Sequence, residues 1–163
     1  MFVNLVLALT SVASALMAGL FYAYSCSVSP GLGRLSDAEY IRSMQHINRA
    51  ILNPVFYVGF MGTLLLLPLS TYLHYGQPLT VRFWCLAAAT LVYAVGVFGV
   101  TVAVNVPLNE ALDAFNTQSA SLSEIAARRA GFEARWNSFN TVRTVSAIAA
   151  TALVAIGCIY REA

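Results

Sequence analysis

Charged side chains are missing from four long intervals of the sequence. These intervals run from Met1 to Gly33, from Ala50 to Leu73, from Phe83 to Asn109 and from Thr144 to Tyr160. An α-helix needs about 20 apolar residues, with a range of about 17–25, to cross the hydrocarbon core of a membrane. The pattern therefore predicts four membrane-spanning helices, over about residues 5–24, 51–73, 83–104 and 144–160.

Backbone chemistry favours helices over strands for these segments. Lipid offers no hydrogen-bonding partners, and an apolar run of this length satisfies its own N–H and C=O groups as a helix. The composition agrees, because 59% of the 163 residues are hydrophobic and only 10% are charged, whereas soluble domains carry roughly 25% charged residues. We expect an all-α fold, an integral membrane four-helix bundle formed by one transmembrane domain over residues 1–163.

The two long connections between spans carry their own helical signals. Ser36 and Glu39 form a capping box that predicts a helix over about residues 37–49. A second helical pattern precedes the fourth span and predicts a loop helix over about residues 122–143. We therefore expect short helices in both large loops that cap one end of the bundle.

The arginines are distributed unevenly between the two ends. Most of them lie in the two large loops, whereas the opposite end has only Arg82 and Arg161. The positive-inside rule places arginine-rich loops in the cytoplasm. We therefore expect both termini outside, the large loops in the cytoplasm, and the lipid bilayer of a bacterial inner membrane as the surroundings.

Several partners and cofactors are not expected from the composition. The net charge of +2 is too small to indicate nucleic-acid binding. The two histidines, His46 and His74, fall at opposite ends of the second predicted span and cannot bind one metal ion. No Glu-x-x-His pair of the kind that di-iron bundles use is present. We expect neither a metal nor another cofactor.

The strongest polar pattern precedes the fourth span. Phe132, Trp136, Asn140 and Arg143 are spaced by 4, 4 and 3 residues, which places them on one continuous helical face. A charge at this depth either faces the bundle interior, where it marks function, or extends outward to the membrane surface. Trp136 either belongs to such a site or is a residue of the aromatic belt at the membrane–water interface.

Asparagines occur at the same end of the predicted bundle. Asn48 lies within an otherwise apolar helical stripe, and His46 shares a different face with Asn53. Asn53 precedes a proline, which also suits a helix N-cap. Asn105 and Asn109 flank another proline, where each either satisfies backbone groups or contributes to a site at the mouth of the bundle.

Four segments give the sequence a resemblance to a known family. They are Phe21-Tyr22-Ala23-Tyr24 with Pro30-Gly31-Leu32, Met44-Gln45-His46-Ile47-Asn48 with Asn53-Pro54, Asn105-Val106-Pro107-Leu108-Asn109, and Trp136-Asn137-Ser138-Phe139-Asn140-Thr141-Val142-Arg143. The chain resembles small four-helix membrane proteins whose characterised members include the anthrone oxygenases of polyketide pathways. The resemblance covers nearly the whole chain and implies the same fold.

The resemblance also implies a reaction. Anthrone oxygenases convert a flat aromatic anthrone to an anthraquinone with O₂ and without metal or flavin, by way of a delocalised carbanion. It implies that Arg143 stabilises the anion, with Asn48, Asn105, Asn109 and Asn140 as hydrogen-bonding groups. Trp136 and Phe139 would stack on the rings and Asn53 would contact the substrate. His46 is the only conventional base in this region of the sequence, although its helical face differs from that of Asn48.

Two other classes of function stay open at this point. The polar residues suit a small-molecule binding or transport protein, although no inverted repeat is present. They also suit a structural or assembly subunit that uses Asn and Arg for helix–helix hydrogen bonds. Oligomeric state is not determined, and a homo-oligomer is one of the partners that the sequence allows.

Overall fold

The computed structural model describes residues 1–160 and is helical throughout its regular structure. The elements are α1 (Phe2–Ala23), η1 (Tyr24–Val28), α2 (Ser29–Leu32), α3 (Asp37–Ala50), α4 (Pro54–Leu73), α5 (Val81–Tyr93), η2 (Ala94–Gly99), η3 (Thr101–Asn105), α6 (Val106–Asp113) and α7 (Leu122–Ile159). Here η denotes a π-helical segment, in which the helix is locally wider. No strand occurs in this part of the chain, which confirms the predicted all-α fold.

Four helical rods are long and apolar enough to cross a membrane. They comprise Phe2–Leu32, Pro54–Leu73, Val81–Asp113 and Leu122–Ile159. The first and third rods each join two α-helices through π-helical segments. Four predicted spans are thus confirmed, and the protein has the helices of an integral membrane protein.

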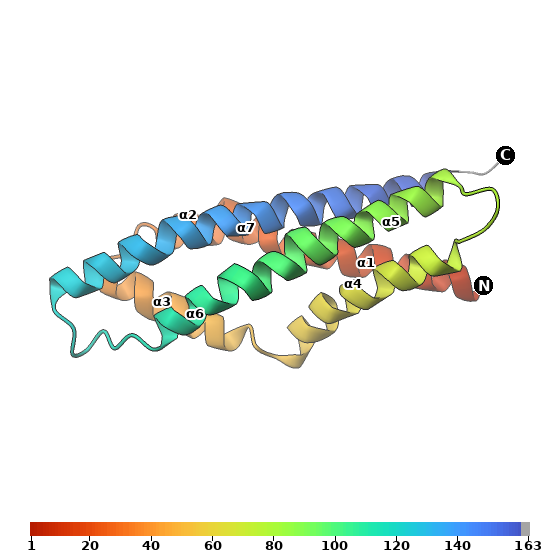
Figure 1. Ribbon diagram of the computed structural model, residues 1–163. Coiled ribbons are helices and arrows are strands. Elements are labelled where there is room, and N and C mark those ends of the chain that lie inside the picture. Colours follow the sequence, from red (N-terminus) through yellow and green to blue (C-terminus); the bar gives the residue numbers. More distant parts are fainter. Residues whose placement is uncertain (161–163) are drawn as a thin grey trace.

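The four rods form an antiparallel bundle. Helix α1 packs against α4 and α7, and α5 packs against the same two helices, so the rods surround a common axis. Figure 1 shows the start of α1, the end of α7 and the α4–α5 connection at one end of the bundle, with α3, α6 and the start of α7 at the other. Both large loops therefore lie at the same end.

The rods extend further than the predicted spans at the end with the large loops. The first continues to Leu32 and the third to Asp113. The intervals 122–143 and 144–160, predicted as a loop helix and a span, form the single helix α7. Nothing breaks this helix, because no proline occurs between them. Arg161, which entered the orientation argument, lies outside the described residues.

Local side-chain chemistry determines where the helices begin at the end with the large loops, which is called the capped end below. Ser36 and Glu39 form the expected capping box at the start of α3. Hydrogen bonds from the hydroxyl and the backbone N–H of Ser36 lower the pKa of the Glu39 carboxyl. Ser121 and Glu124 form an equivalent box at the start of α7. Both boxes satisfy backbone donors that a helix start leaves free.

The interior contains two separate apolar cores. The core between the rods includes Phe21, Phe60, Leu86, Tyr93, Val97, Ala147 and Val154. The core of the capped end consists of Tyr40, Ile41, Met44, Leu112, Ile125, Phe132 and Trp136. Along α7 the buried polar residues Asn140 and Arg143 fall between the two cores, and Thr101 and Asn105 do so along the third rod. A polar layer therefore separates the two cores.

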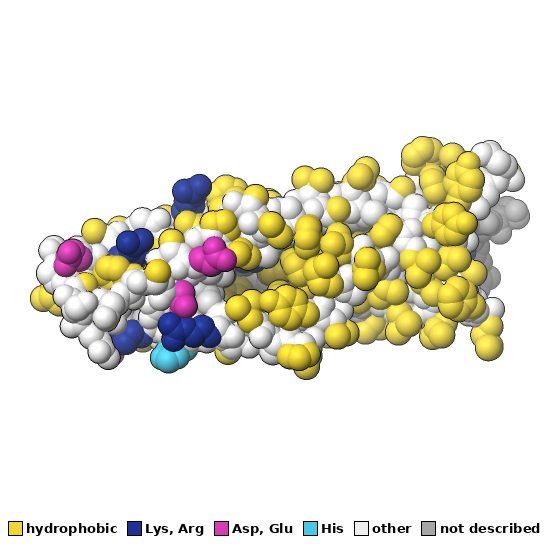
Figure 2. All heavy atoms as spheres, turned by 60° about the horizontal axis from the view of Figure 1, so that its bottom comes forward, with side chains coloured by type: hydrophobic (Ala, Val, Ile, Leu, Met, Phe, Trp, Pro, Cys, Tyr) yellow, Lys and Arg dark blue, Asp and Glu magenta, His cyan; other side chains and the backbone are white. Residues whose placement is uncertain are grey.

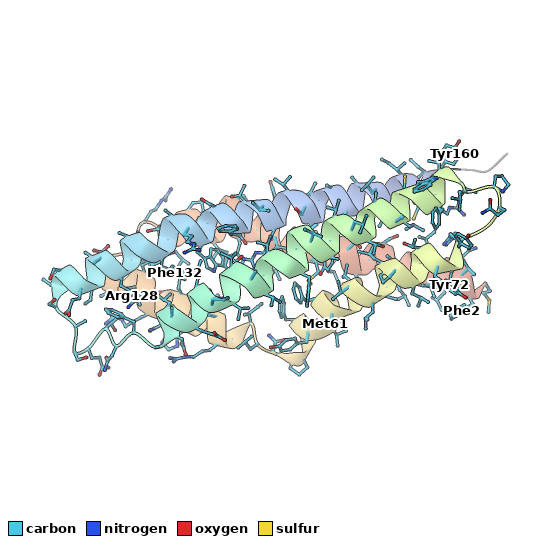
Figure 3. The ribbon with its side chains drawn as sticks, in the orientation of Figure 1. Phe2, Met61, Tyr72, Arg128, Phe132 and Tyr160 are labelled. Atoms are coloured by element: carbon cyan, nitrogen blue, oxygen red, sulfur yellow. The ribbon has the colours of Figure 1, made fainter. Side chains whose placement is uncertain are left out.

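The surface divides along the same axis. Figure 2 shows charged side chains gathered at one end and hydrophobic side chains covering the remainder of that face. Figure 3 shows Arg128 and Phe132 at the capped end, and Phe2, Tyr72 and Tyr160 at the end with the chain termini. Exposed tyrosines such as Tyr72 and Tyr160 suit a membrane–water interface. The capped end is the polar end of the molecule.

Candidate functional site

A cavity of about 400 Å³ lies at the level of the polar layer. This volume falls within the range of about 300–1,000 Å³ that is typical of small-molecule sites. Its lining comes from α1, η1, the end of α3, the start of α4, η3, α6 and α7. Figure 2 shows the surface hollowed where the charged end meets the hydrophobic part. Six of the nine predicted site residues line this cavity: Asn48, Asn105, Asn109, Trp136, Asn140 and Arg143.

Arg143 is buried at the inner side of the cavity, with 7% of its surface exposed. Its Nη2 donates to Oδ1 of Asn140 at 2.9 Å, and its Nη1 lies 3.4 Å from the hydroxyl of Thr101. The guanidinium also faces the rings of Phe21 and Trp136, 4.8 and 5.3 Å from their centroids. Its Nε has no hydrogen-bond partner. Neutral dipoles and aromatic faces are thus its surroundings.

The charge of Arg143 has no counter-ion within the described part of the chain, since no carboxylate lies within salt-bridge distance. Burying a charge is costly unless it is paired. Arg143 therefore gives the cavity a positive electrostatic potential, and an anion bound there would relieve the cost. This is the electrostatic character that an anionic ligand or intermediate needs.

A directed chain of hydrogen bonds holds Asn140 against Arg143. The hydroxyl of Thr144 lies 3.0 and 2.9 Å from the carbonyl oxygens of Phe21 and Asn140, so its proton points to them. It must therefore accept from Ser25, at 2.8 Å, and Ser25 accepts from Nδ2 of Asn140, at 3.0 Å. With its N–H group engaged, Asn140 presents its oxygen to Arg143.

Trp136 forms an aromatic wall and orients a second asparagine. Its indole N–H donates to Oδ1 of Asn109 at 2.8 Å. Because an indole nitrogen only donates, the Asn109 oxygen is committed and its N–H₂ group is left for another acceptor. The ring also packs against Tyr24 and Phe132, at centroid distances of 5.6 and 6.3 Å. Trp136 is therefore held in place by one hydrogen bond and by two aromatic neighbours.

The two other asparagines leave polar atoms unsatisfied. Nδ2 of Asn48 and Oδ1 of Asn105 are buried without a hydrogen-bond partner. The Nδ2 of Asn105 reaches the carbonyl of Trp136 only at 3.5 Å. Buried polar groups are rarely left without partners in folded proteins. Together with Asn109 and Arg143, these groups give the cavity several donors and one acceptor that a ligand could use.

Two π-helical segments supply site residues. Tyr24 and Ser25 belong to η1, and Thr101 and Asn105 belong to η3. Each segment ends two residues before a proline, which lacks an N–H group and clashes with the carbonyl four residues earlier. A wider turn relieves this clash, and such turns are frequent at functional sites. The sequence motifs contained both prolines, and strain before Pro107 was expected, but the wider π-helical turns were not predicted.

Three predicted site residues lie outside the cavity. His46 is on the exposed face of α3, so it does not face the polar groups above. Phe139 is half-buried elsewhere on α7. Asn53 caps α4, accepting from the N–H of Phe56 at 3.0 Å and donating to the carbonyl of Ala50 at 2.8 Å. The alternative capping role accounts for Asn53.

Sequence reasoning missed several residues of the site. Phe21 and Tyr24 lay within a motif of the resemblance but had no role assigned, and Thr101 precedes Asn105 by one helical turn. Two carboxylates on α6 also line the cavity, Glu110 and Asp113. These carboxylates were not expected in the site, because the third membrane-spanning helix was expected to end near residue 104.

Carboxylate, imidazole and thiolate groups do not gather as a metal site. Within residues 1–160 no group of three or more His, Cys, Asp or Glu side chains could hold a metal ion. The groups around Arg143 are amides and hydroxyls, which together with the arginine are ligands for anions and for oxygen-bearing organic molecules. The site is therefore suited to an organic ligand with a negatively charged oxygen.

Comparison with known proteins adds a family. The family described as anthrone oxygenase matches residues 54–153, which is more than half of the chain and includes Asn105, Asn109, Trp136, Asn140 and Arg143. No curated protein and no solved structure matches the sequence significantly. The matched segment runs from the start of α4 into the last turns of α7, and the architecture and the sequence motifs agree with the match. The chain belongs to the anthrone oxygenase family.

Proposed function

We propose that the protein is a membrane-bound oxygenase that oxidises an activated aromatic substrate, such as an anthrone, to a quinone with O₂ and without a cofactor. The observation that carries the proposal is the buried guanidinium of Arg143, which faces an aromatic-walled cavity without a carboxylate partner among residues 1–160. Family membership supports the reaction type.

The chemistry of an anthrone requires an anion-stabilising site. Loss of a proton from the methylene carbon gives a carbanion whose charge delocalises onto the ketone oxygen. The anion transfers one electron to O₂, the resulting radicals combine as a peroxide, and loss of water leaves the new carbonyl group. Overall, one O₂ is consumed, with one oxygen atom retained in the quinone and one released as water. A preorganised donor at the developing oxyanion lowers the barrier of the first step.

The cavity residues suit these requirements. Arg143 would donate to the ketone oxygen as negative charge develops on it. The free N–H groups of Asn48 and Asn109 would bind further oxygens of the substrate or of the peroxide. Trp136 and Phe21 would contact the faces of the rings, since both lie beside the guanidinium. His46, Phe139 and Asn53 take no part in the proposed mechanism.

We also propose the membrane setting of the whole chain as one transmembrane domain. The capped end carries most of the arginines, so the positive-inside rule places it in the cytoplasm, in a bacterial inner membrane. A substrate of this kind is apolar and partitions into the bilayer. The outer cavity wall formed by Leu20, Leu52 and Phe56 is apolar as well, which suits such a substrate.

The decisive experiment is oxygen uptake by purified protein with an anthrone. We expect one O₂ per anthrone and, with ¹⁸O₂, one labelled atom in the new carbonyl group. Binding is measured separately through the fluorescence of Trp136. The variant Trp84→Phe removes the other tryptophan, which is exposed on α5 far from the cavity. Quenching without oxygen uptake would refute the oxygenase and favour a binding protein.

A further inference from the structure

We infer that Glu110 is the base that removes the methylene proton, acting at the end of the cavity opposite Arg143. The inference rests on the proposed function and names the residue that this function still lacks. His46 lies outside the cavity, so a different proton acceptor is needed. Glu110 lines the cavity from α6 and is exposed to solvent.

The substrate itself determines where a base must lie. In an anthrone, the ketone carbon and the methylene carbon occupy opposite corners of the middle ring. Bond lengths of about 1.2 Å for C=O and about 1.5 Å for C–C place the ketone oxygen roughly 4 Å from the methylene carbon. If Arg143 binds the oxygen, the acidic carbon points away from Arg143. The base therefore belongs across the cavity from the guanidinium.

The required separation follows from ordinary contact distances. A hydrogen bond from guanidinium to oxygen spans about 2.9 Å. A base oxygen in position to attack lies about 3–3.5 Å from the carbon that carries the proton. With the substrate between them, guanidinium and base lie about 10 Å apart.

Glu110 borders the cavity at a different level of the third rod from Arg143. Arg143 contacts Thr101, and Glu110 follows Thr101 by nine residues on the same rod. At 1.5 Å per residue this is about 13 Å along the axis. Because part of this stretch is π-helical, Glu110 borders the cavity roughly 10–13 Å beyond the level of Thr101 along the axis.

The neighbouring carboxylate does not meet the same conditions. Asp113 forms an ion pair with Arg49 at 2.7 Å. It also lies almost one helical turn further from Arg143 than Glu110 does, at about 18 Å from Thr101 along the axis. Among the residues that the structure describes, Glu110 has no salt bridge. It is the cavity carboxylate whose oxygens are available to a substrate.

Glu110 would remove both methylene protons in one turnover, one at a time. The carboxylate first takes the methylene proton, and the electron pair moves onto the ketone oxygen beside Arg143. After O₂ has added as a peroxide anion, the carboxylic acid returns the proton to the terminal oxygen. The regenerated carboxylate then removes the remaining proton of that carbon as the O–O bond breaks, and the departing hydroxide takes this proton to form water and free the carboxylate. Glu110 exchanges protons with solvent at the cavity mouth, while Arg143 stays buried.

Deuterium exchange without oxygen isolates the proposed step. Wild-type protein and an anthrone are incubated in D₂O under anaerobic conditions, and loss of the methylene signal is followed by NMR. General bases contribute about 10²–10⁴-fold, so we expect Glu110→Gln to slow exchange and oxygen uptake by at least about 10²-fold.

Two further measurements distinguish a lost base from lost binding. Trp136 fluorescence should report that Glu110→Gln binds the anthrone with unchanged affinity. Formate should restore part of the activity of Glu110→Ala, because it supplies a carboxylate to the vacated space.

Asp37→Asn is the matched control, since it neutralises a half-exposed carboxylate that does not line the cavity. It should stay within about threefold of wild type, a change too small for the loss of a general base. Oxygen uptake by Glu110→Gln at the wild-type rate would refute the role of Glu110 and leave the oxygenase standing. Absence of uptake by the wild type would refute the oxygenase, whereas exchange that depends on Glu110 would still support the base.

Discussion

Replacing Arg143 with methionine should separate activity from stability. Methionine is shorter but fills a similar volume and has no charge. Burying an unpaired charge is costly, so replacing it with an apolar side chain should be neutral or stabilising, whereas removing one partner of a buried ion pair costs about 3–5 kcal/mol. Arg143 has no carboxylate partner among residues 1–160, so the first case applies. If Arg143 mainly stabilised the bundle, Arg143→Met would instead lower the stability of the protein substantially.

The magnitudes follow from the contacts of the guanidinium. Loss of one oxyanion donor reduces turnover by about 10²–10³-fold, and we expect this effect for Arg143→Met. Truncation leaves Oδ1 of Asn140 without its donor at 2.9 Å, which costs about 1–3 kcal/mol. Relief of the unpaired buried charge offsets this cost. The melting temperature should therefore stay within about 5 °C of wild type, since 1 kcal/mol corresponds to about 2–4 °C in a domain of this size.

Arg143→Lys provides the matched comparison. Lysine keeps the charge but carries it on a compact ammonium group, which cannot present the planar fork of arginine. It cannot donate to Asn140 and to a substrate oxygen with the geometry of the guanidinium. We expect turnover between those of wild type and Arg143→Met, with the affinity for the substrate anion largely kept.

The assay combines oxygen uptake with thermal unfolding in the same detergent. Each variant is first shown to unfold cooperatively, and its uptake rate is then measured with an anthrone at saturating concentration. A stable Arg143→Met protein with wild-type turnover would remove Arg143 from the mechanism. A large loss of stability would instead show that Arg143 holds the helices together and refute the reasoning from its missing counter-ion.

Further predictions concern the aromatic wall, the hydrogen-bond chain, cofactors and orientation. Trp136→Ala should weaken anthrone binding more than it slows turnover, measured as a rise in KM, because the ring contacts the substrate before and during the reaction. Ser25→Ala should lower kcat with little change in KM, since it frees the Asn140 amide to turn away from Arg143. An unchanged kcat would show that the hydrogen bond from Asn140 to Ser25 does not position Asn140 for the reaction. Purified protein should hold no stoichiometric iron, copper, haem or flavin by metal analysis and absorption spectroscopy, and a Soret band would overturn this. In a cysteine-free background, an impermeant maleimide should label Gln77→Cys in intact cells but not Gln118→Cys, and the reverse would invert the topology.

The sequence was sufficient for the bundle because the bilayer imposes a simple condition on it. A charged side chain in hydrocarbon is costly, so the four charge-free intervals predict the rods of Figure 1 without knowledge of any contact. Local rules acted similarly at Ser36 and at Asn53, where the cap depends only on residues within one helical turn. The spacing of Trp136, Asn140 and Arg143 likewise placed them on one face.

Properties that depend on neighbouring helices were beyond these rules. Periodicity places His46 on a helical face but does not say which face of α3 meets the bundle. It does not place Ser25 beside Asn140, which is 115 positions away. Nor does periodicity indicate that the third rod extends through Asn105 and so brings Glu110 to the cavity.

By itself, then, the sequence determined the number of spanning helices, their alternation in direction and the end at which polar chemistry gathers. These follow from local periodicity and from the energy of charges in lipid. Only the tertiary structure decided that Arg143 is buried without a carboxylate partner among residues 1–160, and that Asn48, Asn109 and Glu110 share its cavity. The physical reason is that burial and pairing depend on which faces of separate helices meet, and side-chain packing across the bundle sets those faces.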